Sequence, residues 1–289
     1  MADYKIITDV TCDLPPDLID SNDLIIMPMK YSVGEATYTN YADFREQSIA
    51  EFYDEMLAGE VTHTVQLNSE DYMNTYKKYL DQGYDILGII FSSGLSGSFN
   101  SCRLAVNELK AMYPERTIEI VDTLAASTGE GLIALHGTKN KQNGMSLIDN
   151  KNDLESFKLH MSHWFTVSDL EYLRRGGRVS NAAAFVGKAL NIKPVLHVDN
   201  EGHLIPKFKK IGRKASIREI ARQYEKSVDK DYPRICITHA NCLEDAMELK
   251  KLVLKVSNPK EIIISNIGTV IGSHSGPGTL ALFFKANQR

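Results

Sequence analysis

The sequence predicts an α/β protein of two domains, with a mostly parallel N-terminal sheet flanked by helices and a C-terminal α+β domain. The chain has 289 residues, whereas a typical domain has ~150. Short apolar runs alternate with segments of helical spacing in the first half, which is typical of a parallel sheet with crossover helices. In the second half, strand-like runs joined by short turns are mixed with helices, which indicates an α+β arrangement.

In the first half, apolar runs predict strands over residues 4–8, 25–31, 86–91 and 117–121. Helical spacing predicts helices over 49–57, from the capping residue Asn68 to Gly83, over 98–112, and from about 124 to 136. The run 86–91 is entirely apolar, and crossover helices on both faces of a parallel sheet explain why this strand has no polar alternation.

The polar stretch 137–153 contains several Asn and Lys residues and is the best candidate for a domain boundary. The domains are therefore predicted as 1–150 and 151–289. In the second, strands are predicted over 165–167, 192–198, 203–209, 234–238, 261–265 and 269–272, and helices over 217–228, 243–256 and the tail around 282–284. Residues 200–202, Asn-Glu-Gly, predict a hairpin turn.

Composition excludes several classes of protein. Hydrophobic residues make up 43% and charged residues 24%, which excludes a disordered chain, a collagen or a coiled coil. Lys and Arg number 33 and Asp and Glu number 37, so the formal net charge is −4, unlike the basic excess of a general nucleic-acid binder. No apolar run approaches the ~20 residues of a membrane helix. The opening MADYKIITD lacks the features of a secretory signal, so we expect a cytoplasmic protein.

The cysteines and two histidines show no sign of a disulfide framework or a metal site. Cys12, Cys102, Cys236 and Cys242 form no C-x-x-C pair, and we expect reduced thiols, no metal and no cofactor. His160 and His163 lie three residues apart on a predicted helix, without a carboxylate or Cys in register. We interpret this pair as surface histidines.

Residues 92–98, Ser-Ser-Gly-Leu-Ser-Gly-Ser, form the strongest candidate site. The segment lies between a buried strand and a helix, where hydroxyls and free backbone N–H groups create an anion site. The simpler interpretation is a tight turn with a Ser cap. No G-K-[ST] follows, so the segment is not a Walker A loop.

Three further clusters stand at predicted element ends. Residues 62–66 contain Thr64, the strand over 117–121 is followed by Asp122, and residues 272–278 place His274 in a Gly/Pro turn beside Ser residues. A histidine in such a stiff turn is expected to face a pocket. The tract 172–178 is cationic and contains a double glycine. Taken alone, the tract is interpreted as a helix C-terminus, where positive charges interact favourably with the helix dipole.

Together and in this order, these segments resemble the DegV family of bacterial fatty-acid-binding proteins. The segments that carry the resemblance are 7–15, Thr64 with Gln66, 92–98, 122–129, 172–178, 192–194 and 270–278. The resemblance implies a non-catalytic protein that holds one long-chain fatty acid, with its carboxylate between the domains and its tail in a C-terminal tunnel. It also implies a partner, a separate ATP-dependent fatty-acid kinase, to which this chain presents the acid before carrying the acyl phosphate.

The family resemblance assigns roles to individual residues. Thr64, Ser92 or Ser93, and His274 match the carboxylate-binding positions, with Ser93 favoured over Ser92. Arg175 matches an arginine linked to engagement of the kinase. The family segment T-S-Q-P-S reads Thr-Val-Gln-Leu-Asn at 64–68, so the hydroxyl at Val65 and the stiff proline at Leu67 are missing here.

A fatty acid needs an apolar tunnel and a polar end. Each buried methylene contributes roughly 0.8 kcal/mol, so the tail favours an apolar channel. The predicted wall residues are Phe165, Phe185, Val186, Leu190, Ile192, Val195 and Leu196. A bidentate arginine would hold the carboxylate too firmly for phosphorylation in place, so we expect hydroxyls, backbone N–H groups and His274 as donors.

The main alternative is a serine hydrolase acting on an acyl ester. It would use Ser93 or Ser96, His274 and an acid such as Asp122, and GLSGS at 94–98 nearly fits the G-x-S-x-G motif. A phosphotransfer enzyme would use the serine loop as an anion cradle, but it lacks a P-loop lysine. An interaction protein would use two cationic patches, the tract 172–178 and the cluster formed by Lys207, Lys209, Lys210, Arg213 and Lys214.

Overall fold

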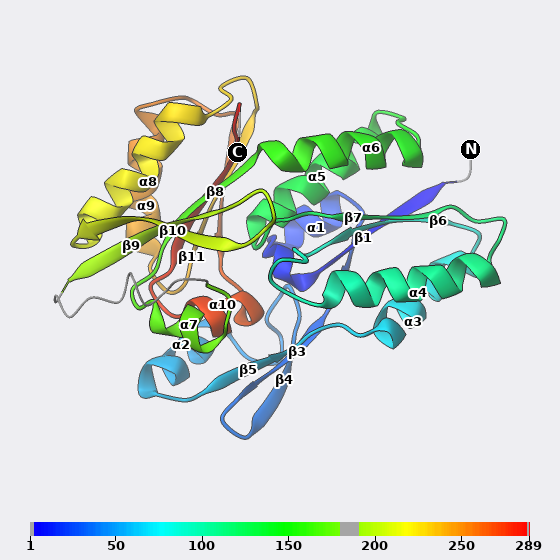
Figure 1. The fold of residues 1–289 in the computed structure, drawn as a ribbon, viewed down its shortest axis with the longest axis horizontal. Helices are drawn as coiled ribbons and strands as arrows, with labels where there is room; N and C mark the ends of the chain where they lie inside the picture. The colour runs from blue at the N-terminus through cyan, green and yellow to red at the C-terminus, as the bar shows by residue number, and fades with distance from the viewer. Residues whose placement is uncertain (1–2, 180–190, 288) are drawn as a thin grey trace.

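The computed structural model describes residues 3–179, 191–287 and 289. It contains a parallel sheet flanked by helices, a small antiparallel sheet and a mixed C-terminal sheet (Figure 1). The predicted α/β class is therefore confirmed. Of the predicted tunnel walls, Phe185, Val186 and Leu190 lie outside the described residues.

The first sheet has the strand order β2-β1-β6-β7, and every pair in it is parallel. Its strands are β1 (Tyr4–Asp9), β2 (Leu24–Met27), β6 (Asp85–Ile90) and β7 (Ile118–Asp122). Helices α3 (Ser69–Leu80) and α4 (Ser98–Met112) cover one face, and α5 (Thr128–Gln142) and α6 (Leu147–Phe157) cover the other (Figure 1). Short α1 (Pro16–Ser21) packs beside β2.

The central strand β6 shows why an uninterrupted apolar run forms here. Ile86 and Ile90 pack into the core under α3 and α4, whereas Leu87 and Ile89 pack into the core under α5 and α6. Both faces are buried, so neither needs polar side chains. Gly88 lets Tyr76 approach, because a Cβ there would lie 2.2 Å from the Tyr76 hydroxyl.

The helix predicted from about 124 begins later, at Thr128, and continues to Gln142. Leu124 and Ser127 have φ angles of 50° and 53°, which a right-handed helix does not allow. The residues before α5 therefore form a loop at the end of β7, and this loop reaches the cavity described below.

The small sheet has the order β4-β3-β5 and is antiparallel. It contains β3 (Met29–Val33), β4 (Ala36–Asn40) and β5 (Thr62–Val65), with α2 (Ile49–Ala58) packed against it. The single strand predicted over 25–31 is wrong. The chain leaves the first sheet after β2 and enters the small sheet as β3, with Pro28 between them, because proline cannot donate to a continuous ladder.

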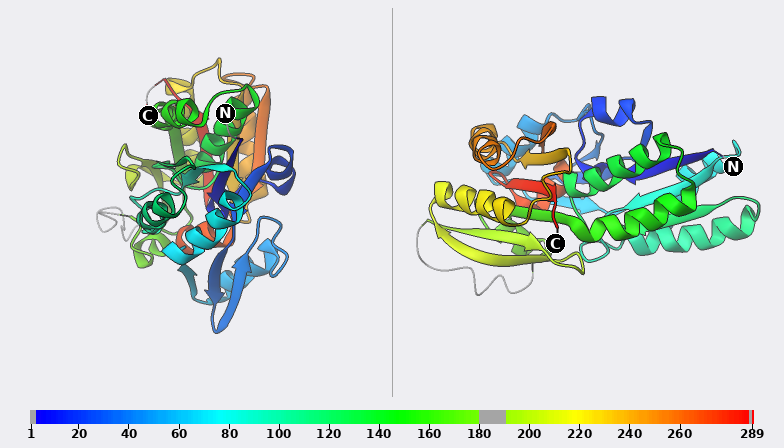
Figure 2. Two further views of the ribbon diagram at one scale, coloured as in Figure 1. Left: turned by 90° about the vertical axis from the view of Figure 1, so that its right-hand side faces the viewer. Right: turned by 90° about the horizontal axis from the view of Figure 1, so that it is seen from above.

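The C-terminal sheet has the order β10-β9-β8-β13-β11-β12; among its described strand pairs, β11–β12 is parallel and the others are antiparallel. Its strands are β8 (Met161–Thr166), β9 (Ile192–Val198), β10 (Leu204–Ile211), β11 (Arg234–His239), β12 (Glu261–Asn266) and β13 (Leu280–Lys285). Helices α8 (Arg213–Ser227) and α9 (Leu243–Leu254) cover its outer face (Figures 1 and 2).

Three sequence predictions in this half are wrong. Residues 269–272 belong to helix α10 (Thr269–Ser275), not to a strand, and the tail forms β13 instead of a helix. His160 lies in a 3₁₀ turn and His163 in strand β8, where it is buried. Short apolar runs suit a central strand and a buried helix equally well, so the periodicity could not separate them.

Helix α5 lies between the two large sheets. It contacts β1 and β6 on one side and β8, β11 and β13 on the other. Its residues Leu132 and Ile133 share one core with Phe283 of the C-terminal sheet. The boundary predicted near residue 150 falls within α6 and stays a prediction.

Asp13 connects three segments near this junction. Its carboxylate accepts hydrogen bonds from the Ser127 hydroxyl at 2.5 Å and from the Gly268 backbone N–H at 2.9 Å. Ser127 directly precedes α5 and Gly268 directly precedes α10. Burial raises the pKa of Asp13 to about 7, against these hydrogen bonds, which favour the charged form.

We predict that Asp13→Asn changes the pH dependence of stability. The folded pKa lies above the ordinary value of 3.8, so the folded protein keeps this proton to higher pH than the unfolded chain does. The ionisation of Asp13 therefore lowers the free energy of unfolding as pH rises from about 4 to 7, and the effect levels off above pH 7. Relative to the natural protein, Asp13→Asn should gain about 2–4 kcal/mol over this range. Denaturant unfolding at several pH values measures the gain.

The control for this experiment is Asp17→Asn, which removes an exposed carboxylate from the neighbouring helix α1. Its stability should follow that of the natural protein at every pH. A parallel profile for Asp13→Asn as well would contradict the raised pKa.

Candidate functional site

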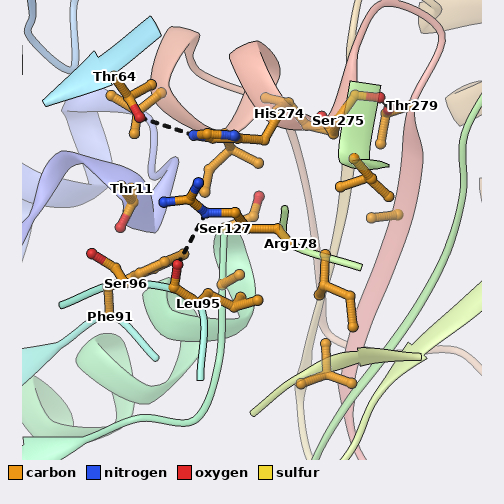
Figure 3. Close-up of a pocket in the computed structure, with 18 of the residues that line it drawn as sticks. Thr11, Thr64, Phe91, Leu95, Ser96, Ser127, Arg178, His274, Ser275 and Thr279 are labelled. Carbon is orange, nitrogen blue, oxygen red and sulfur yellow. Dashed lines mark hydrogen bonds between the residues drawn. The ribbon is translucent and has the colours of Figure 1, made fainter. Parts of the chain in front are cut away.

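A cavity lies between the ends of the first sheet's strands and the inner face of the C-terminal sheet. It encloses about 170 Å³, many times the ~10–15 Å³ that one water molecule needs. Its polar end includes the side chains of Thr11, Thr64, Ser96, Ser127, Arg178, His274, Ser275 and Thr279 (Figure 3). The remainder is mostly apolar, with Phe165, Leu173, Val198, Leu204, Ala281 and Phe283 among its walls.

Thr64 and His274, the two residues to which the family resemblance assigns carboxylate binding, meet at the polar end. The Thr64 hydroxyl lies 2.9 Å from Nε2 of His274 (Figure 3). His274 occupies the last turn of α10, so the predicted Gly/Pro turn begins after it. Strand β5 carries Thr64 past α10, and the Thr62 hydroxyl donates to the Ser273 carbonyl at 3.3 Å.

The imidazole of His274 is closely packed and uncharged at neutral pH. A Cβ on Gly176 would lie 2.4 Å from Nδ1 of His274, so this glycine permits the approach. Burial, together with the positive charge of Arg178 and the nearby His63, lowers the pKa of His274 to about 4. A neutral imidazole offers one N–H donor and one acceptor nitrogen.

Within the serine loop, residues 92–98, the structure separates the hydroxyls that the sequence analysis grouped. The buried Ser92 hydroxyl donates to the Gly202 carbonyl at 3.0 Å, which attaches the loop to the β9–β10 turn. Ser93 is exposed, and its backbone N–H donates to Asp122 at 3.1 Å. Neither side chain lines the cavity, whereas Ser96 does.

The position of Ser96 follows from hydrogen bonds within the loop. Its backbone N–H donates to the Ser92 carbonyl at 3.1 Å, and its hydroxyl accepts from the Ser98 N–H at 3.2 Å. The backbone N–H of Gly97 donates to Gln66 at 3.1 Å. Gln66 directly follows strand β5, so the segment that carries Thr64 also binds the serine loop.

Arg178 is a site residue that the sequence analysis did not identify. Its guanidinium lies at the polar end among Thr11, Ser96 and His274 (Figure 3). Nε donates to the Leu95 carbonyl at 3.2 Å, and Nη1 donates to the Gly176 carbonyl. Among the described residues, no Asp or Glu forms an ion pair with it. The double glycine after α7 (Glu171–Arg175) was the available signal, because it ends the helix and turns the chain toward the cavity.

Behind Thr11 lies a group of buried carboxyls. The Asp9 carboxylate accepts the Thr11 backbone N–H at 2.9 Å, and Glu130 accepts the hydroxyls of Thr8 and Thr11 at 2.8 and 3.0 Å. Burial raises the pKa values of both acids, that of Glu130 strongly. These raised pKa values favour the uncharged forms of the two acids, which would reduce repulsion of an anionic ligand.

The apolar part of the cavity uses one face of the C-terminal sheet. Ala281 and Phe283 lie two residues apart on β13 and therefore share the face that lines the cavity. Phe165 on β8 pairs with Ala281. Phe165 was a predicted wall. Val195 was another, but it packs under α8 on the opposite face, because successive strand residues point in opposite directions.

The groups proposed for a serine hydrolase are engaged in other contacts. Asp122 accepts the backbone N–H groups of Ser93 and Leu124 at 3.1 and 3.2 Å. The His274 nitrogen Nε2 is paired with Thr64. Among the described residues, no three His, Cys, Asp or Glu side chains are grouped so that they could hold a metal ion.

Arg175, the predicted kinase-contact residue, is exposed at the end of α7. Its guanidinium lies 4.9 Å from the ring centre of Tyr172. Over the described ranges, no helix has the length and apolarity needed to cross a membrane.

Comparisons with known proteins cover nearly the whole chain. Residues 3–287 match the family model described as "Uncharacterised protein, DegV family". A DegV domain-containing protein of Clostridium perfringens is 37% identical over 285 residues, which is 98% of each chain.

Solved structures agree with these sequence matches. The chain resembles a DegV family protein of Thermus thermophilus, described by its fatty-acid binding, with a TM-score of 0.88, 29% identity, and coverage of 99% of this chain and 100% of that one. It also resembles DegV of Bacillus subtilis, described as a fatty acid binding protein, with a TM-score of 0.83, 30% identity, and coverage of 98% and 99%. From its sequence and its fold alike, this chain belongs to the DegV family.

Proposed function

We propose that this protein binds one long-chain fatty acid, with the carboxylate at the polar end of the cavity and the tail along the C-terminal sheet. The observation that carries the proposal is the division of a single cavity into a hydrogen-bonding end and an apolar remainder. Relatives of the same fold that are described as fatty-acid-binding support it.

The two parts of the cavity suit the two parts of such a ligand. A ~15-carbon tail gains on the order of 12 kcal/mol from leaving water, before ordering costs are subtracted. At the other end, Thr64, Ser96 and neutral His274 provide hydrogen bonds without a net charge. Arg178 provides one positive charge, and two of its five N–H donors already bind backbone carbonyls. These two contacts fix the guanidinium at the polar end. Its presence there differs from the expected donor set, which contained no arginine.

We further propose that the protein is a carrier without catalytic activity. A hydrolase needs an acid that orients the histidine and a histidine that contacts the serine. Here Asp122 binds backbone N–H groups and His274 contacts Thr64. These contacts favour binding over hydrolysis. Such a carrier needs no cofactor.

The family resemblance supports a specific use for the bound acid. A separate ATP-dependent fatty-acid kinase, in the cytoplasm, phosphorylates the carboxylate, and this chain then carries the acyl phosphate. Arg175 is exposed three residues before Arg178, so one short segment connects the partner surface to the head-group site. The neighbouring Arg174 forms an ion pair with Glu171, whereas Arg175 lies over the Tyr172 ring.

Native mass spectrometry of protein purified from cells tests ligand class. We expect a mass increase that matches one long-chain fatty acid and disappears on denaturation, because the apolar cavity retains such a ligand through purification. Protein that carries no lipid and does not bind added stearic acid would contradict the proposed function.

A pair of serine variants tests the head-group geometry. Ser96→Ala removes a hydroxyl from the cavity and should weaken stearate binding by about tenfold, as should His274→Ala. Ser93→Ala is the comparison, because Ser93 was favoured from the sequence but its side chain lies outside the cavity. Equilibrium binding of a fluorescent fatty acid measures all three. A loss confined to Ser93→Ala would place the carboxylate elsewhere.

Arg175→Ala separates partner contact from ligand binding. The variant should bind stearate normally but support at least tenfold less kinase turnover, since the side chain is exposed and outside the cavity. Arg174→Ala is the matched control, with a loss of less than twofold. The readout is acyl phosphate formed by the organism's own fatty-acid kinase. Full turnover with Arg175→Ala would exclude the assigned role.

A further inference from the structure

A second cavity, of about 380 Å³, lies next to the head-group end of the first. Thr11 and Ile267 line the first cavity, whereas the adjacent Cys12 and Gly268 line the second. The two cavities are therefore separated by a wall that these two short segments form. The volume lies within the ~300–1,000 Å³ of small-molecule pockets, and the proposed function does not use it.

Two polar side chains of this second cavity have unused hydrogen-bonding groups. Asn40, the last residue of β4, is only 2% exposed, and neither its amide oxygen nor its amide nitrogen forms a hydrogen bond with any described residue. The hydroxyl of Ser265 on β12 is also buried without a partner among those residues. Buried amides and hydroxyls are normally hydrogen-bonded, so these unpaired atoms around one cavity indicate a binding site.

The Asn40 amide lies beside Gly268, together with a carboxyl and an aromatic ring. A Cβ at this glycine would lie 2.7 Å from Oδ1 of Asp13, 3.4 Å from Nδ2 of Asn40 and 3.7 Å from Cε1 of Phe44. All four residues line the second cavity. The φ angle of Gly268 is −69°, which any residue adopts. The glycine is therefore needed because a side chain would occupy the point on which these three groups converge.

The charges and the walls of the second cavity restrict the class of ligand. Among the described residues, no Lys, Arg or His lines it, whereas Asp13 and Asp43 do. A phosphate or a carboxylate would meet these acids without a compensating cation. Most of the other lining residues are apolar, such as Leu14, Pro15 and Ile264, and a sugar would leave several hydroxyls unpaired against them. The cavity therefore favours an uncharged ligand with apolar faces and a polar edge.

We propose that the second cavity binds a nucleobase or nucleoside that carries an exocyclic amino group, as adenine does. A side-chain amide offers an acceptor beside its donors and adenine offers the complementary pair, so an asparagine binds adenine through two hydrogen bonds. A carboxylate oxygen has two lone pairs, and Oδ1 of Asp13 uses one for the Gly268 N–H. The other can accept from the amino group of the ligand. The flat face of the base suits the Phe44 ring.

The proposal does not depend on fatty-acid binding, because the two cavities have no lining residue in common among those described. Isothermal titration calorimetry of the full chain with adenine, adenosine, inosine and AMP tests it. Adenosine should bind about tenfold or more tightly than inosine, since inosine carries a carbonyl oxygen in place of the donating amino group. AMP should bind more weakly than adenosine, because its phosphate adds negative charge beside the two acids.

Asn40→Leu removes both amide groups at nearly constant volume and should weaken adenosine binding by about tenfold or more. Its unfolding temperature without nucleoside should not fall, because the amide makes no hydrogen bond that the variant loses. The matched control is Asn143→Leu, which changes an exposed asparagine after α5 and should leave the affinity unchanged. If Asn40→Leu does not fold, Asn40→Ala and Ser265→Ala take its place, and each should weaken adenosine binding.

Equal affinities for adenosine and inosine overturn the proposal, as does an unchanged adenosine affinity in the Asn40 variant. Loss of adenosine binding in His274→Ala also overturns it, because the nucleoside would then occupy the first cavity. If neither adenine nor adenosine binds, the proposal is wrong, and stearate binding by the same protein shows that the proposed function still holds.

Discussion

The inner face of the C-terminal sheet is the constraint on which the rest of the structure depends. Helices α8 and α9 cover the outer face, whereas α5, the end of α6 and Leu173 of α7 share a core with the inner face. An apolar sheet face cannot remain in water without a large loss of stability. The two halves of the chain must therefore pack together, and the space that α5 leaves uncovered is the cavity.

The sequence predicted the parts of the fold in which local pattern and final packing agree. The strand 86–91 and the helix 98–112 were placed almost to the residue, because a doubly buried strand and an amphipathic helix have different periodicities. Residues 269–272 and the tail were wrong, since a short apolar run fits either structure. The change of sheet at Pro28 depends on partners distant in sequence, which the local pattern does not contain.

The candidate site divides in the same way. Thr64 and His274 were named from their motifs, and the fold brings them within hydrogen-bond distance. Which serine of residues 92–98 lines the cavity depends on how the loop turns. Ser92 contacts the β9–β10 turn, and Ser96 lies at the cavity. Arg178 and the burial of His163 were missed because their positions follow from the change of direction at the double glycine and from strand register. The double glycine was a signal for Arg178, but the residue types alone do not give the direction in which the chain continues.

Strand β5 has a consequence for how the polar end responds to an occupant. Its four residues and the following Gln66 contact α10 through Thr62 and Thr64 and the serine loop through Gln66. Helix α10 and the serine loop are thus hydrogen-bonded to the same short segment, residues 62–66. The positions of His274 and Gly97 are therefore coupled through a short stretch of chain, since Thr64 and Gln66 are next but one to each other.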